Sequence, residues 1–201
     1  MGNILLEGLR LERSKKLLQS VSTILDTFIA WMTSQLQSSG SKPLSIVLPA
    51  LMTLIPDAQV RCVFDGSGGI GYLSRHLRYD HLGDTRASAQ QLYELCFCLW
   101  LMSYDVESSD AIRNHFHRDG AVAVLCDLVA SSPREKVVRC ALATLRNLAT
   151  CKAALKVQRR GSDSVIQGSD FLFEIVGCGL MKSLETLRSR QWTDPDIVEG
   201  A

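Results

Sequence analysis

The chain has 201 residues, 46% of them hydrophobic, and its 22 basic and 21 acidic residues leave a formal charge of +1. This length and hydrophobicity suffice for a buried core, which excludes disorder throughout. A charge so close to zero attracts neither nucleic acid nor an anionic membrane, and no run of about 18 apolar residues is present, so we expect no nucleic-acid partner and no direct membrane insertion. Seven cysteines, an odd number with no secretory signal, indicate reduced thiols in the cytosol.

The amino-terminal part of the chain reads as two helices. Apolar residues recur at spacings of three and four from Leu17 to Met32, which predicts a long amphipathic helix. After a Ser/Gly-rich break, Pro43 suits the first turn of a second helix, which Pro56 ends. We expect these helices to form an amino-terminal hairpin over residues 1–60, followed by one continuous run of repeats over residues 61–201.

The next elements are helices of unequal length. Short helices are predicted over Ala58–Phe64 and Ile70–Leu77, and a polar connection over Tyr79–Arg86 leads to a long helix over Gln91–Ser103. That long helix is apolar nearly all round, so we expect it to lie between neighbouring helices on both sides. Further short helices are expected between residues 105 and 130.

The last third of the chain contains another long helix, predicted over Glu135–Ala149. Ser132, Pro133 and Glu135 have the arrangement of a capping box with proline in the first turn, which predicts how this helix begins. Lys152–Ser169 is rich in charged residues, glycine and serine, and it is predicted to be a solvated connection. The final helices are expected over residues 170–190.

Three segments form a weak internal repeat: GGIGYLSRHL from Gly68, DGAVAVLCDLV from Asp119 and CGLMKSLETL from Cys178. Each has a glycine in its first two positions and continues into an amphipathic helix, at a spacing of about 50 residues, close to the period of armadillo and HEAT units. Such a unit cannot bury its own apolar face, so several must stack. The sequence therefore predicts an all-α fold, a right-handed α-solenoid of armadillo/HEAT-like helical repeats.

Motifs for nucleotide binding are weak. Gly66, Gly68 and Gly71 satisfy the pattern G-x-G-x-x-G, and Asp84 stands near the distance expected of a ribose-binding acid. A dinucleotide site also needs a strand before the glycines and a parallel strand after the helix. Here a helical segment follows, so a flexible turn is the better interpretation.

Motifs for metal binding and hydrolysis are weaker still. Cys96 and Cys98 are two residues apart on a helix, so their sulfurs diverge by about 200 degrees, and His115 and His117 have the same spacing. The sequence has no G-x-S-x-G, H-E-x-x-H or G-x-x-x-x-G-K motif. We therefore expect no catalytic residues, no metal, no cofactor and no enzymatic activity.

The polar side of the Glu135–Ala149 helix is the best candidate for partner binding. Lys136, Arg139 and Arg146 lie near one stripe with Asn147 alongside, and Trp100 has a comparable place one unit earlier. The stripe is either a solvated surface or part of a groove, and Trp100 is either a groove residue or a core residue. In armadillo stacks the third helices line a concave groove, where asparagine bonds a partner's backbone and arginine its carboxylates.

Three stretches carry a family resemblance: QLYELCFCLWLMSYD, SSPREKVVRCALATLRNLA and CGLMKSLETLRSRQWTDPDI. In order and spacing they resemble the H subunit of the vacuolar-type proton ATPase (V-ATPase), across Gly66–Val198. The last stretch ends in the family's tryptophan and acidic tail, here Trp192, Asp194 and Asp196.

The resemblance implies a non-catalytic, regulatory component of a rotary proton pump. Such a component couples ATP hydrolysis to proton transport, silences hydrolysis when the sectors separate, and docks on a peripheral stalk made of the E and G subunits. Its expected location is the cytoplasm, peripheral on the cytosolic face of vacuolar and other endomembranes. The family's carboxy-terminal domain is expected to be absent from these 201 residues, which leaves stalk docking as the role best retained.

A second interpretation remains open, an armadillo-type adaptor that binds an extended peptide or a helix of another partner. Such adaptors carry a regular ladder of tryptophan and asparagine on successive third helices. Only Trp100 and Asn147 are available for that ladder here.

Overall fold

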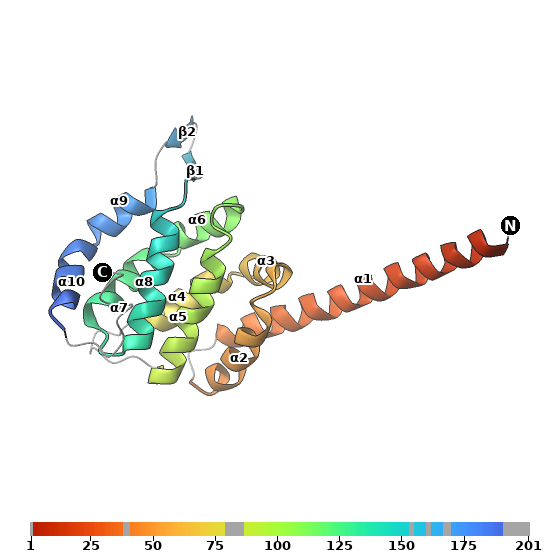
Figure 1. Cartoon of the computed structure of the whole chain (residues 1–201), viewed down its shortest axis with the longest axis horizontal. Coiled ribbons are helices and arrows are strands. Elements are labelled where there is room, and N and C mark those ends of the chain that lie inside the picture. The colour runs from red at the N-terminus through yellow and green to blue at the C-terminus, as the bar shows by residue number, and fades with distance from the viewer. Residues whose placement is uncertain are drawn as a thin grey trace.

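The computed structural model describes residues 2–37, 41–78, 87–152, 155–159, 162–166 and 170–190. Within these residues the chain forms ten helices and one β-hairpin, which confirms the predicted all-α solenoid apart from the hairpin (Figure 1). The elements are α1 (Gly2–Leu36), α2 (Ser41–Leu54), α3 (Ala58–Gly66), α4 (Gly69–Leu77), α5 (Ala89–Ser103), α6 (Asp110–Arg118), α7 (Ala121–Ser131), α8 (Glu135–Ala149), β1 (Leu155–Arg159), β2 (Ser162–Ile166), α9 (Asp170–Gly177) and α10 (Leu180–Arg188). None of the helices in these ranges is both long and apolar enough to cross a membrane.

The helices from α3 onward stack as units of up to three. The first unit is α3, α4 and α5, the second is α6, α7 and α8, and α9 and α10 begin a third. Equivalent helices lie against each other: α3 against α6, α4 against α7, α5 against α8, and α7 against α10. Each unit thus covers the apolar face of its neighbour, as the repeat pattern predicts.

Glycines set the junctions inside these units. Gly68, Gly120 and Gly179 have φ angles of +85°, +69° and +75°, and each is the residue immediately before the second helix of its unit. A left-handed φ is costly for other residues because of their Cβ atom. The three glycines of the predicted repeat therefore occupy the same structural position, and the repeat is confirmed.

The glycine pattern does not form a nucleotide loop. Gly66 ends α3, Gly68 precedes α4 and Gly71 lies within α4, so helices stand on both sides of the turn. The strand that a dinucleotide site requires is not present here. Asp84, the predicted polar connection Tyr79–Arg86 and the acidic tail with Trp192, Asp194 and Asp196 lie outside the described residues.

Helix α5 lies at the centre of a single hydrophobic core. It packs against α2, α4 and α8, as predicted for a helix that is apolar nearly all round. Leu95, Cys96, Cys98 and Leu99 are fully buried. Burial raises the pKa of both thiols, so these cysteines are unreactive core residues.

The predicted capping box at Ser132 is wrong, although α8 does begin at Glu135. Ser132 is the residue immediately after α7, its hydroxyl oxygen accepts a hydrogen bond from the Arg134 N–H at 3.2 Å, and α8 has no side-chain cap. Serine cannot cap a helix that starts three residues later. A complete capping box stands instead at α5, where Ser88 and Gln91 bond reciprocally.

The predicted solvated connection over Lys152–Ser169 is also wrong in part. Strands β1 and β2 pair antiparallel, with Leu155 opposite Ile166 and Arg159 opposite Ser162. The hairpin projects from the stack beyond α8 and α9 (Figure 1). Valine and isoleucine among the polar residues favour strands, but the charged composition concealed them.

Histidine–carboxylate hydrogen bonds tie α6 to the units on both sides. His115 Nδ1 lies 2.7 Å from Asp65 Oδ1 on α3, and His117 Nδ1 lies 2.9 Å from Glu174 Oε2 on α9. Asp65 is buried, and burial raises its pKa above the ordinary value of 3.8, while the hydrogen bond and charge of His115 oppose this rise. These two histidines therefore serve packing between units.

The raised pKa of Asp65 predicts a pH-dependent stability that Asp65→Asn should remove. Below pH 3.8 the carboxyl is protonated in folded and unfolded chains alike. Between that value and the raised pKa only the unfolded chain releases the proton, so rising pH costs the wild type stability. The variant should therefore gain stability relative to the wild type through this window and then hold a constant difference, measured by urea unfolding at a series of pH values. A difference that shrinks as pH rises would mean that attraction to His115 outweighs burial.

Candidate partner-binding surface

The five residues predicted to bind a partner come from two helices that pack side by side. Trp100 is on α5, and Lys136, Arg139, Arg146 and Asn147 are on α8. Lys136 and Arg146 are exposed, and the other three are half-buried. Since α5 and α8 are the third helices of successive units, the stack brings these residues onto adjoining helices.

An aromatic ladder runs along this side of α5. The ring centroids of Tyr93 and Phe97 are 5.9 Å apart, those of Phe97 and Trp100 are 5.5 Å apart, and those of Trp100 and Tyr104 are 5.5 Å apart. Tyr104 was not a predicted site residue, although spacings of four, three and four residues could have identified the ladder. Trp100 is thus one rung of a continuous aromatic stripe.

One cation of α8 stands beside the ladder. The Lys136 Nζ atom lies 6.0 Å from the centroid of the Tyr93 ring, within the range of a cation–π interaction. Lys136 and Arg146 form no ion pair with any residue that the structure describes. We call this surface the aromatic–basic face; it consists of Tyr93, Phe97 and Trp100 of α5, Tyr104 immediately after that helix, and Lys136, Arg139 and Arg146 of α8.

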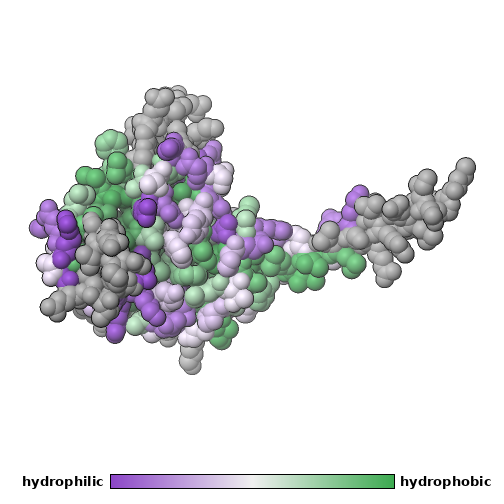
Figure 2. Space-filling model, in the orientation of Figure 1, coloured by the Kyte–Doolittle hydropathy of each residue, from purple (hydrophilic) through white to green (hydrophobic). Residues whose placement is uncertain are grey.

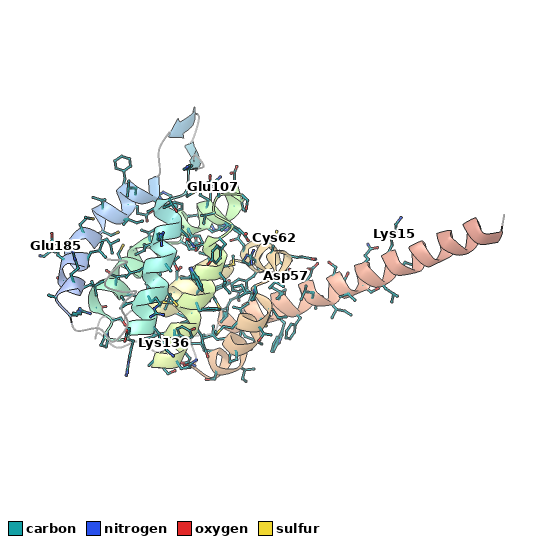
Figure 3. All side chains as sticks on the ribbon, viewed as in Figure 1. Lys15, Asp57, Cys62, Glu107, Lys136 and Glu185 are labelled. Carbon is teal, nitrogen blue, oxygen red and sulfur yellow. The ribbon has the colours of Figure 1, made fainter. Side chains whose placement is uncertain are left out.

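One end of the aromatic–basic face is hollowed. A cavity of about 350 Å³ opens where α5 and α8 begin, and its lining includes Tyr93, Arg134, Glu135 and Lys136. Figure 3 shows Lys136 at this end of α8. The aromatic wall of this hollow suits an inserted apolar side chain, and its two cations outnumber its one carboxylate, which favours an acidic neighbour of that side chain.

Asn147 is already engaged within the chain. Its Nδ2 atom donates to Ser103 Oγ at 2.8 Å, and the Ser103 hydroxyl donates to the Trp100 carbonyl oxygen at 2.6 Å. This network ties α8 to the end of α5 and fixes the backbone beneath the ladder. Binding of a partner's backbone by Asn147 stays a prediction.

The side chains of the face are of the kinds found in protein interfaces. Its charged members are cations, its largest side chains are aromatic, and no group of three or more histidine, cysteine or acidic side chains among the described residues could hold a metal ion. Aromatic and arginine side chains dominate the energetic centres of protein interfaces. The arrangement therefore fits an acidic, partly apolar protein segment.

Comparison with known proteins gives a family match over nearly the whole chain. The family model for the V-ATPase H subunit matches residues 3–200. A probable H subunit of the V-type proton ATPase from Oryza sativa subsp. japonica is 27% identical over 189 residues, covering 93% of this chain and 36% of that protein. The H subunit of the V-type proton ATPase of Drosophila melanogaster is 27% identical over 174 residues, covering 87% of this chain and 33% of that protein. The chain thus spans about a third of the length of these curated relatives.

Solved structures with a similar fold include designed armadillo repeat proteins. One, in complex with the peptide (KR)4, has a TM-score of 0.62 and 13% identity, covering 86% of this chain and 60% of the other. Another, designed for modular peptide recognition, has a TM-score of 0.61 and 12% identity, covering 91% of this chain and 72% of the other. At such identities the likeness establishes the armadillo fold alone.

Proposed function

Because the chain belongs to the family of V-ATPase H subunits, we propose that it is a non-catalytic component that couples ATP hydrolysis to proton transport and docks on the peripheral stalk of the E and G subunits. It would act on the cytosolic face of the membrane, held there through the complex. Regulation of hydrolysis is the family role that this proposal leaves aside.

The observation that carries the proposal is the aromatic–basic face. It extends over two units that share one core, so its shape is fixed by packing rather than by loops. A rigid face suits a stator, which must grip a stalk under torque without changing shape. The half-buried rings of Phe97 and Trp100 would supply apolar contact, and Lys136 and Arg146 would select acidic residues.

Reversing two charges tests the docking. Lys136→Glu combined with Arg146→Glu is expected to weaken binding to the E–G heterodimer by about tenfold or more, since two exposed cations would become anions facing an acidic surface. Isothermal titration calorimetry of the full chain measures the change. The loss should be largest at low salt, because the lost attraction is electrostatic.

A matched control reverses two exposed cations of α10, Lys182→Glu with Arg188→Glu, which leaves the same net charge on the chain. This control should bind as the wild type does. Equal affinity of all three proteins, each folded by circular dichroism, would remove the face from the docking site. If the wild-type chain binds an acidic peptide but does not bind the E–G heterodimer, the adaptor interpretation is favoured.

A further inference from the structure

Helix α1 carries a second apolar stripe that the fold does not use. Five of its apolar residues are between 42% and 68% exposed: Leu17, Val21, Ile24, Phe28 and Trp31. They follow one another at spacings of four, three, four and three residues, the heptad spacing of a helix–helix seam. Figure 2 shows this stripe as a hydrophobic band along α1 where the helix leaves the stack.

A different face of α1 joins the core. Ile29, Met32 and Leu36 are fully buried where α1 packs against α2, α3 and α4. These residues lie about 100 degrees around the helix from the stripe. Folding of the solenoid therefore explains one apolar face of α1 and leaves the other uncovered.

The polar side chains that border the stripe can be covered by a partner at little cost, because their hydroxyl groups are already hydrogen-bonded. The hydroxyl of Ser20 donates to the Lys16 carbonyl oxygen at 2.9 Å, and that of Thr27 donates to the Thr23 carbonyl oxygen at 2.8 Å. Both side chains thus satisfy their donors within α1, so covering them removes no essential bond to water. The Phe28 and Trp31 rings stack at 5.7 Å with an interplanar angle of 16°, which makes a broad plate near the stack.

The geometry around α1 leaves room for a long partner. The helix extends well away from the stack, so that a second helix can lie along it without meeting the other units (Figure 1). A seam of residues every 3.5 positions fits another helix with the same spacing, because each side chain then enters a hole between four partner residues.

We propose that this stripe binds an α-helix of a partner, and that this helix has its own apolar residues at heptad spacing. The partner is the one that the aromatic–basic face holds, so the inference rests on the proposed function. The stripe covers two heptads, whereas a coiled coil that is stable by itself needs about three to four. A second copy of this chain would thus pair too weakly through the stripe. A helix already tethered at the aromatic–basic face binds the stripe at high effective concentration, so two heptads suffice.

The test compares two variants of the full chain with equal charge and equal helix-forming residues. Val21→Glu with Ile24→Lys interrupts the seam, and Gln19→Glu with Thr23→Lys makes the same change on exposed positions away from it. The E–G heterodimer is the probe in calorimetry. The seam variant is expected to bind about tenfold or more weakly, and the control variant to bind as the wild type does.

Each of the other possible outcomes contradicts a specific part of the proposal. Wild-type binding with an unchanged seam variant overturns the seam and leaves the proposed function standing. If the wild type itself does not bind the E–G heterodimer, both the proposed function and the proposed partner of the stripe are wrong. A wild-type dimer in sedimentation that the seam variant abolishes would assign the stripe to a second copy of this chain. Co-sedimentation of the wild type, but not of the seam variant, with anionic vesicles would assign the stripe to a membrane surface.

Discussion

Replacing Leu99 with alanine is expected to lower the free energy of unfolding by about 3 to 5 kcal/mol. Leu99 is fully buried in α5, the helix that packs against α2, α4 and α8. Truncation removes buried methyl groups and leaves a cavity that the surrounding helices cannot close, because each is fixed by its own neighbours. Urea unfolding followed by far-ultraviolet circular dichroism measures the loss.

The same substitution at Leu17 is the control for this prediction. Leu17 lies on the projecting part of α1 and is 60% exposed, so Leu17→Ala should change the free energy of unfolding by no more than about 0.5 kcal/mol. Equal effects at the two positions, or a loss below about 1 kcal/mol at Leu99, would contradict a core centred on α5.

Features that depend on a single residue type were predictable from the sequence. The left-handed φ at Gly68, Gly120 and Gly179 almost requires glycine, so the repeat could be aligned without the structure. Capping serines were less decisive. Both Ser88 and Ser132 have a polar partner three residues later, but only Ser88 stands where a helix starts.

Features that depend on tertiary contacts were not predictable. The His115–Asp65 and Arg61–Asp105 pairs join residues more than 40 positions apart, and nothing in their local sequence marks them. The amphipathic pattern of α1 was recognised, but periodicity alone could not separate its buried face from its exposed stripe. The spacing of the aromatic ladder was visible in the sequence, but its partial exposure was not, because an aromatic side chain on a central helix is expected to lie in the core.

Arg61 ties three segments together, and its loss is expected to be costly. Its Nε donates to Asp105 Oδ2 at 2.6 Å and its Nη2 to Asp105 Oδ1 at 3.1 Å. Its Nη1 donates to the carbonyl oxygens of Ile55 and Pro56, at 3.1 and 2.7 Å, just after α2 ends. The Arg61 side chain is 10% exposed and that of Asp105 is 22% exposed, so water can replace few of these bonds.

A double-mutant cycle separates the ion pair from the carbonyl contacts. Arg61→Ala is expected to lower the free energy of unfolding by about 3 to 5 kcal/mol, since it leaves a half-buried carboxylate and two carbonyl oxygens without their hydrogen-bond donor. Asp105→Ala should cost less, because Arg61 keeps both carbonyl bonds. The double variant should be more stable than the sum of the single losses predicts, by about 1 to 3 kcal/mol, because neither charge is then left alone. Strictly additive losses in urea unfolding would mean that the arginine acts through the carbonyls and that its pairing with Asp105 contributes nothing to stability.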